Sequence, residues 1–269
     1  MLVDELPIAS FRTPPLAVTG GGRPPTHAGP GTTKAASMAT PATSVHPGSQ
    51  VFNVRLAISA ERHADAGVLL RRMYAWRGYA FEAGAREEGD KVTLYAETGG
   101  NLVGTMSLCL DRHGALPADE HFGDRLDILR REGRRLCEPS RLAIDKGMSK
   151  RVFASLIHIS YLYAHRLHGF TDYVIEINPR HVAFYRHMLG FADCGAERQC
   201  SRVGAPAVLL RLPLDHMAAQ IAKWGGTHEQ NSSGQNGGER SFYPYFFPVR
   251  EEPGITARLA ALCGTGGRA

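Results

Sequence analysis

The passage from an apolar run into an Asn-Pro pair is the feature that most constrains the fold of this chain. Residues 173–177 hold Tyr, Val and two Ile, and a short run of this kind predicts a buried strand. Asn178 is a good helix N-cap and Pro179 suits the first helical position, so a helix should begin at once and end at Gly190. A strand that leads directly into a helix is typical of an α/β fold.

Strand and helix patterns recur through residues 51–224, which we expect to form one domain. Apolar and polar residues alternate over 52–58, and again on both sides of residues 98–101, where a hairpin is predicted. The other predicted elements are helices from Ser59 to about 77, at 122–131 and from Ser149 to Gly169, and strands at 136–144, 191–198 and 207–212. This order predicts an α/β sheet of mixed direction.

The two ends of the chain differ from this domain in composition. Residues 1–50 contain 8 Pro, 6 Gly and 11 Ser or Thr, so we expect a disordered leader. Within the terminal stretch 225–269, residues 225–240 lack aliphatic and aromatic side chains and should form a flexible linker. The aromatic cluster at 242–248 could pack on the domain, bind a partner or do neither.

Composition and charge exclude several classes of protein. With 43% hydrophobic and 21% charged residues, the chain is not wholly disordered. No apolar run approaches the roughly 18 to 20 residues of a membrane-spanning helix, and the acidic start is unlike a secretory signal. We therefore expect a cytoplasmic protein without integral membrane contact. A net charge of +5 suits an acidic protein partner as well as nucleic acid, and we expect no nucleic-acid partner.

Metal binding is not expected from the sequence. The five cysteines include no C-x-x-C pair. His158, His165 and His168 on the predicted long helix lack i, i+4 spacing and an acidic neighbour.

Pro139 is unusual inside the predicted strand 136–144, because proline cannot donate to a sheet ladder. A β-bulge at this point would accommodate it and would leave a backbone N–H free to polarise a ligand carbonyl. The polar residues Glu138, Ser140 and Arg141 cluster here and are candidate catalytic residues. The alternative is a structural ion pair between Glu138 and Arg141 at a sheet edge.

Two helix starts are candidate anion sites. Ser149, Lys150 and Arg151 place two cations at a terminus where the helix dipole is already positive, and a bound phosphate would make this arrangement favourable. Arg180 and His181 lie on the first turn after the Asn-Pro cap and are candidate substrate ligands. In both places, solvated surface side chains are the alternative.

The run Phe184-Tyr185-Arg186-His187-Met188-Leu189-Gly190-Phe191 resembles a common signature of the GNAT acyltransferase superfamily. Glu138-x-Ser140-Arg141 is similar to the E-x-S-R motif of LuxI-type autoinducer synthases. More closely, residues 55–211 resemble the FeeM-type N-acyl amino acid synthases, on the stretches 136–145, 176–181 and 200–207. The resemblance implies a GNAT-like mixed, mostly antiparallel sheet flanked by helices.

The resemblance also implies an activity: transfer of a long-chain fatty acyl group from the phosphopantetheine thioester of acyl carrier protein to an amino acid. The thioester, or acyl-CoA in its place, is then a co-substrate, and no tightly bound cofactor is needed. Glu138 is the candidate base for the amine. Ser140 could position the amine or the carbonyl, and Arg141 could orient Glu138 or pair with the substrate carboxylate. Tyr185 is either the acid that protonates the leaving thiolate or a packed aromatic.

The sequence differs from the related families at two places, and these differences narrow the choice of acyl donor and product. The loop at residues 145–151 has one glycine and a bulky Met148 where GNAT enzymes carry a glycine-rich pyrophosphate loop, which disfavours coenzyme A. Ser107 stands about where homoserine-lactone synthases have an arginine, which counts against that activity. The remaining rivals are an acyl-CoA-dependent GNAT enzyme and a noncatalytic module that binds acyl chains or a protein.

The densest basic cluster consists of Arg130, Arg131, Arg134 and Arg135. Solvated cations at a helix end are the default interpretation. The alternative hypothesis is that they help to seat the acidic acyl carrier protein.

Overall fold

The computed structural model describes residues 52–76, 90–112, 116–201, 204–228 and 241–265. The predicted leader and most of the predicted linker lie outside these residues. Helices and strands of the domain follow in the order β1 (Asn53–Leu56), α1 (Ala60–Trp76), β2 (Asp90–Thr98), β3 (Asn101–Leu110), α2 (Asp119–Arg131), β4 (Leu136–Ile144), α3 (Lys150–Tyr161), a π-helical turn (Leu162–Leu167), β5 (Asp172–Ile177), a 3-10 turn (Pro179–His181), α4 (Val182–Leu189), β6 (Ala192–Cys200), β7 (Ala205–Pro213) and α5 (Leu214–Trp224).

The described strands form one seven-stranded sheet in the order β1-β2-β3-β4-β5-β7-β6. β4 and β5 pair in parallel, and the other neighbours pair antiparallel. This confirms the predicted sheet of mixed, mostly antiparallel direction. The predicted hairpin is β2–β3, and Thr98 pairs with Asn101 across its turn.

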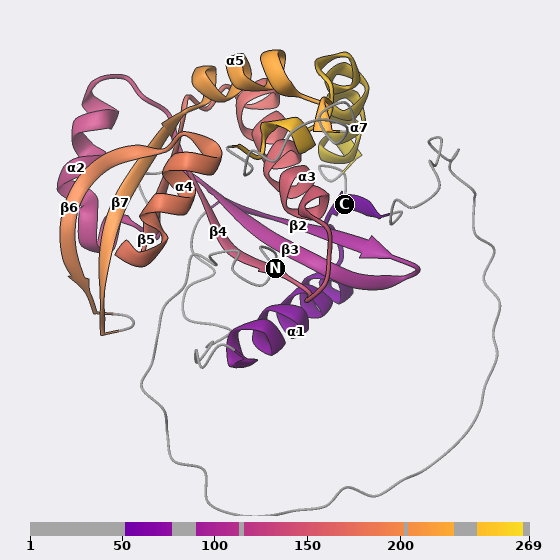
Figure 1. Ribbon diagram of the computed structural model, residues 1–269, viewed down its shortest axis with the longest axis horizontal. Coiled ribbons are helices and arrows are strands. Elements are labelled where there is room, and N and C mark those ends of the chain that lie inside the picture. The colour runs from indigo at the N-terminus through magenta and orange to yellow at the C-terminus, as the bar shows by residue number, and fades with distance from the viewer. Residues whose placement is uncertain (1–51, 77–89, 113–115, 202–203, 229–240, 266–269) are drawn as a thin grey trace, which may run out of the picture.

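Helices cover both faces of the sheet (Figure 1). On one face, α1 packs on β4 through Leu70 and Ala143, and α2 packs on β4, β5 and β7 through Phe122, Leu126 and Leu129. On the other face lie α3, α4 and α5, in a larger core with the alternate residues of the same strands. The period of two therefore sends neighbouring residues of β4 and β5 to opposite faces.

A segment at the C-terminal end adds to the larger core. It comprises two 3-10 turns (Tyr243–Tyr245 and Val249–Glu251) and helix α7 (Glu252–Thr265). Phe242, Tyr243 and Phe246 are almost fully buried against the α3 side. Of the three fates open to the aromatic cluster, the structure shows packing on the domain, beside α3 and α5 (Figure 1). Within the described residues, no helix is both long and apolar enough to cross a bilayer.

Candidate active site

The candidate site lies where β4 and β5 separate. In these two fully described strands, the parallel pairing consists of Leu136 with Asp172 and Cys137 with Tyr173. Beyond Cys137, β4 keeps its antiparallel ladder with β3 but has no paired partner in β5. A gap therefore opens in the middle of the sheet beside the residues that the sequence singled out.

The predicted β-bulge is present in β4. Ser140 pairs with Ser107 and Ala143 with Thr105, so two residues of β4 stand opposite one residue of β3. The additional residue lies at Arg141–Leu142, while Pro139 keeps its register opposite Leu108. Arg141 has a φ of 49°, and among the described residues it is the one non-glycine residue with positive φ. The strand thus turns at Arg141, directly after the candidate catalytic residues.

A small apolar cavity occupies the gap on the α3 and α4 side of the sheet. Its volume is about 20 Å³, which is room for about one water molecule. An acyl chain would have to displace side chains to enter it. The lining residues come from β3, β4, β5, α3, α4 and the loop after α4, and they are Met106, Pro139, Leu142, Ile157, Tyr173, Ile175, Tyr185, Leu189 and Phe191.

Glu138 projects to the other face of the sheet. Its carboxylate is buried, and Oε2 accepts a hydrogen bond of 2.9 Å from the backbone N–H of Ala118. Ala118 precedes the first residue of α2, so the carboxylate lies at a helix N-terminus, where the helix dipole stabilises negative charge. Glu138 is therefore held in place by the start of α2, beside the gap between β4 and β5.

Ser140 lies beside Cys109 of β3, with 3.8 Å between the hydroxyl oxygen and the sulfur. Burial raises the pKa of the Cys109 thiol to about 11, and the nearby Glu138 carboxylate adds to this effect. Cys109 is consequently protonated at neutral pH and is a poor nucleophile. The polar groups at this end of β4 suit positioning of a reactant, with Glu138 as the candidate base.

Tyr185 forms part of the cavity wall, across the sheet from Glu138. Its ring makes edge contacts with Phe184 and Phe191, at centroid distances of 5.3 and 5.6 Å. Burial raises the pKa of the Tyr185 phenol well above its usual range, so the hydroxyl stays protonated at neutral pH. The ring is packed, as one of the two interpretations from sequence expected, and the acid role of Tyr185 stays a prediction.

The two predicted anion sites are separate helix starts. Ser149 occupies the N-cap position of α3 with an extended backbone, although its hydroxyl makes no capping hydrogen bond. Lys150 and Arg151 follow on the first turn and are partly exposed. At the other start, Asn178 accepts from the Arg180 N–H at 3.1 Å, and the Arg180 guanidinium contacts His181 at 3.1 Å. Anion binding at these two helix starts stays a prediction.

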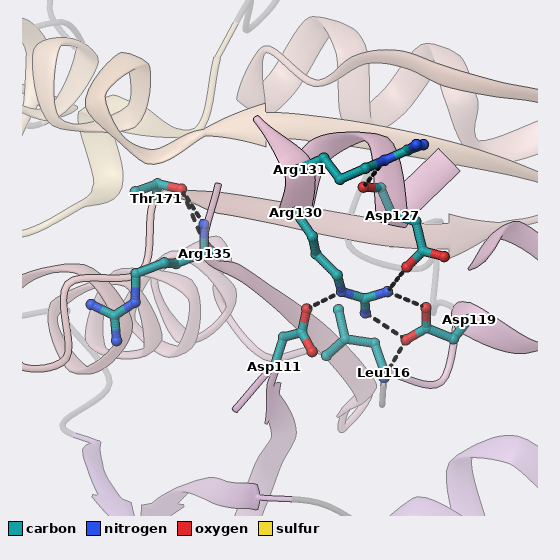
Figure 2. A network of polar contacts seen from close by, with 8 residues as sticks. All are labelled: Asp111, Leu116, Asp119, Asp127, Arg130, Arg131, Arg135 and Thr171. Carbon is teal, nitrogen blue, oxygen red and sulfur yellow. Dashed lines mark hydrogen bonds and ion pairs between the residues drawn. The ribbon is translucent and has the colours of Figure 1, made fainter. Parts of the chain in front are cut away.

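The arginine cluster differs from the default interpretation of solvated cations. Arg130 is enclosed by Asp111, Asp119 and Asp127 at 2.6 to 2.8 Å, as Figure 2 shows. Arg134 binds the fully buried carboxylate of Asp172 at 2.6 Å. Asp127 is three residues from Arg130 on the same helix, but Asp111 and Asp119 lie 19 and 11 residues away from Arg130, and Asp172 lies 38 residues from Arg134. The sequence therefore did not reveal most of these ion pairs.

The other two arginines of the cluster are exposed. Arg131 bonds to the backbone of Asp127, and Arg135 donates to the Gly169 carbonyl while lying over the Phe170 ring. Neither side chain has its charge neutralised by these contacts, which are with backbone oxygens and an aromatic ring. The hypothesis of a docking surface is accordingly narrowed to Arg131 and Arg135.

One cluster of polar side chains was not found from the sequence. His121 of α2, Glu176 of β5 and Cys200 of β6 lie together on the α2 face of the sheet. The three residues belong to different elements and have no short-range spacing. Only the pairing of the sheet brings them together.

Comparison with known proteins supports the resemblance. The family model described as N-acyl amino acid synthase FeeM matches residues 65–213, more than half of the chain. The solved structure of FeeM, an N-acyl amino acid synthase from uncultured soil microbes, is 30% identical, with a TM-score of 0.57 over 63% of this chain and 94% of that chain. No curated protein matches.

More distant solved structures include a putative N-acetyltransferase from Lactobacillus plantarum, with 15% identity and a TM-score of 0.45 over 61% of this chain and 98% of that chain. The AHL synthase LasI has 16% identity and a TM-score of 0.44, over 62% of this chain and 91% of that chain. All candidate site residues, from Glu138 to Tyr185, lie inside residues 65–213.

Proposed function

Because the chain belongs to the FeeM family of N-acyl amino acid synthases, and is thus an acyltransferase of the GNAT fold, we propose that it acylates an amino acid with a long-chain fatty acyl group carried by acyl carrier protein. The observation that carries this proposal is the gap between β4 and β5, which is bordered by Glu138 on one face and by an apolar cavity on the other. A thioester carbonyl held in this gap is accessible from both faces.

The reaction is the aminolysis of a thioester. Glu138 takes one proton from the substrate ammonium, directly or through a water molecule, and the neutral amine then attacks the carbonyl carbon. The C–N bond forms, the C–S bond breaks, and the second amine proton is lost as the intermediate collapses. Tyr185 gives its proton to the departing thiolate and recovers one from solvent. The products are the amide, the free pantetheine thiol and one proton.

The other polar residues bind and orient the reactants in this proposal. Ser140 positions the amine or the carbonyl, and Arg141 pairs with the substrate carboxylate, for which a guanidinium gives two parallel hydrogen bonds. Lys150 and Arg151, at the start of α3 with Ser149, bind the phosphodiester of phosphopantetheine. Arg180 and His181 supply a second site for an anionic group of the substrate.

A comparison of donors tests the proposal. We expect N-acyl amino acids when the full chain is incubated with acyl carrier thioester and a mixture of amino acids, detected by mass spectrometry. With acyl-CoA of the same chain length, kcat/KM should be at least about tenfold lower, which corresponds to about 1.4 kcal/mol. Equal or faster turnover of acyl-CoA would overturn the donor assignment. The absence of an amide with either donor would overturn the enzyme activity itself.

The exposed arginines provide a test of carrier docking. Replacing both Arg131 and Arg135 by Glu should raise KM for the acyl carrier substrate steeply at low ionic strength, because docking of an acidic partner is electrostatic. Turnover of a short acyl-pantetheine thioester should not change, and this substrate is the control. An unchanged KM for the carrier substrate would remove both residues from the docking surface.

A further inference from the structure

Three residues that are known metal ligands in proteins converge beside the gap in the sheet. They are His121 on the first turn of α2, Glu176 near the end of β5 and Cys200 at the end of β6. One ligand atom from each lies within 4.8 Å of the other two. The cluster is on the α2 face, whereas the apolar cavity is on the α3 face, so the two sites are distinct.

Burial gives this cluster the character of a built site. The side chains of Glu176 and Cys200 are fully buried, and that of His121 is 8% exposed. His121 Nδ1 and Glu176 Oε1 are 3.1 Å apart. Around tetrahedral zinc, with bonds of about 2.0 to 2.2 Å to nitrogen and oxygen, neighbouring ligands are roughly 3.3 Å apart. The imidazole and the carboxylate therefore already have nearly the spacing that a shared zinc ion requires.

We propose that His121 Nδ1, the Glu176 carboxylate and the Cys200 thiolate bind a divalent transition metal, with zinc as the best fit. A set of one nitrogen, one oxygen and one sulfur ligand is typical of zinc, and a thiolate ligand disfavours magnesium and calcium. The buried carboxylate supports the same assignment, since a buried charge is stable when it is paired or coordinates a metal. This proposal departs from the expectation from sequence that the chain binds no metal.

The surroundings of His121 supply the outer contacts of such a site. Ser201 Oγ lies 2.9 Å from His121 Nε2 and donates to Glu120 Oε1, also at 2.9 Å. With Nδ1 on the metal, Nε2–H donates to the Ser201 hydroxyl, and a carboxylate orients the ligand through that hydroxyl. Without metal, Nε2 accepts from the Ser201 amide at 3.1 Å. Metal uptake therefore changes the imidazole tautomer and releases the Cys200 thiol proton to solvent.

The metal would join α2 to the two strands on the far side of the gap. The same start of α2 holds Glu138 through the N–H of Ala118. The site is thus a structural tie that fixes the helix terminus on which the Glu138 carboxylate rests. It does not depend on the identity of the acyl donor or of the amino acid.

The test uses the untagged full-length chain, stripped of metal with a chelator and titrated with zinc and with cobalt(II). We expect one zinc ion per chain and, with cobalt, a thiolate-to-metal charge-transfer band in the near ultraviolet. Cys200→Ser should abolish this band and weaken zinc binding by more than the roughly 10- to 100-fold that the loss of an outer contact costs. The matched control is Cys194→Ser, because Cys194 is a half-buried cysteine in the same strand. This variant should keep the cobalt band and the zinc affinity of the wild type.

His121→Ala provides a second variant if the change at buried Cys200 prevents folding, since its side chain is at the edge of the cluster. It should weaken zinc binding as well. The proposal is overturned if the wild-type chain shows no thiolate-to-cobalt band, or if the band and the zinc affinity persist in both His121→Ala and Cys200→Ser.

Discussion

At the scale of single residues, Arg141 holds a backbone conformation that L-residues avoid. A left-handed residue that is not Gly or Asn costs about 1 to 2 kcal/mol. The bulge in β4 imposes this φ of 49° directly after Ser140. Strained residues of this kind often lie at functional sites, and here the strain coincides with the candidate ligand for the substrate carboxylate.

Replacing Arg141 by Gly separates the backbone from the side chain. Gly relieves the left-handed strain but adds freedom to the unfolded chain, so the free energy of unfolding should change by less than about 1 kcal/mol. KM for the amino acid should rise at least about tenfold if the guanidinium binds the carboxylate. Urea denaturation and steady-state kinetics measure the two effects. A variant with unchanged KM would leave Arg141 a purely structural role.

Glu138→Gln tests the base. The amide oxygen of Gln can still accept the Ala118 N–H, so the variant should fold and bind both substrates. Turnover should fall by about 10²- to 10⁴-fold, the usual contribution of general-base catalysis. Single-turnover assays with saturating substrates, together with the thermal midpoint of the variant, check both points. Near-normal turnover in a folded variant would show that another group is the general base.

The sequence predicted β4 and its irregularity well, because the signal is local. Pro139 indicated a disturbed strand, and the bulge lies two residues later. The sequence did not predict that Glu138 and Tyr185 face opposite sides of the sheet, nor that Arg130 is enclosed by three aspartates. The first fact depends on how strands and helices assemble in space. The second depends on Asp111 and Asp119, which lie 19 and 11 residues from Arg130.

At the scale of elements, local periodicity predicted each strand of the sheet and helices α1 to α4 to within a few residues. It did not predict α5 or α7. Helix α7 follows the aromatic cluster, and it packs on the π-helical turn that follows α3 rather than on the sheet. The divergence of β4 and β5 could not be inferred either, because it requires the register of both strands.

The aromatic segment supports α4, the helix that carries Tyr185. Phe242 packs between Phe153 and Phe184, at centroid distances of 4.7 and 5.7 Å, and its N–H donates to the Met188 carbonyl at 2.9 Å. Tyr243 donates its hydroxyl to the Leu189 carbonyl at 2.6 Å. The end of α4 is therefore fixed by residues outside the family-matched region.

Phe242→Ala should lower the free energy of unfolding by about 3 to 5 kcal/mol, because it removes a fully buried aromatic side chain. It should also reduce turnover, because Phe184 and the adjacent Tyr185 lose their support. Val249→Ala, at a 44% exposed position of the same segment, is the control and should be nearly neutral. Equal stability of the two variants in urea denaturation would show that the segment does not support the domain.

At the scale of the whole molecule, a buried histidine contributes to joining the C-terminal segment to the domain. His158 of α3 is fully buried and stacks on Phe246 at 5.2 Å. Its Nδ1 accepts from the Phe247 N–H at 3.0 Å, so Nε2 carries the proton and faces Glu252 Oε1 at 3.3 Å. Arg166 holds the other oxygen of Glu252 at 3.2 Å. A neutral imidazole satisfies all of these contacts.

Protonation of His158 would break this arrangement, because Nδ1 could no longer accept from Phe247. Burial lowers the pKa of His158 below its usual 6.5. Burial alone would raise the pKa of Glu252, but the contacts with His158 and Arg166 outweigh it and lower that pKa below 4.5. In both cases the unfolded chain takes up the proton more readily than the folded chain. Both groups therefore reduce the free energy of unfolding as the pH falls.

We expect the loss to begin below pH 6.5 through His158 and to continue below pH 4.5 through Glu252. Between pH 7.5 and 5.5, the His158 contribution should be on the order of 1 kcal/mol, measured by urea denaturation at each pH. Burial also lowers the pKa of His168, which therefore adds to the total loss of stability on acidification. The difference in this loss between the wild type and His158→Gln isolates the part that comes from His158. The glutamine side chain of that variant does not take up a proton, so the variant should lose less stability on acidification. His63→Gln, at an exposed position of α1, is the control and should lose as much stability as the wild type. Parallel pH profiles for the wild type and His158→Gln would show that His158 does not make the attachment of the C-terminal segment sensitive to acid.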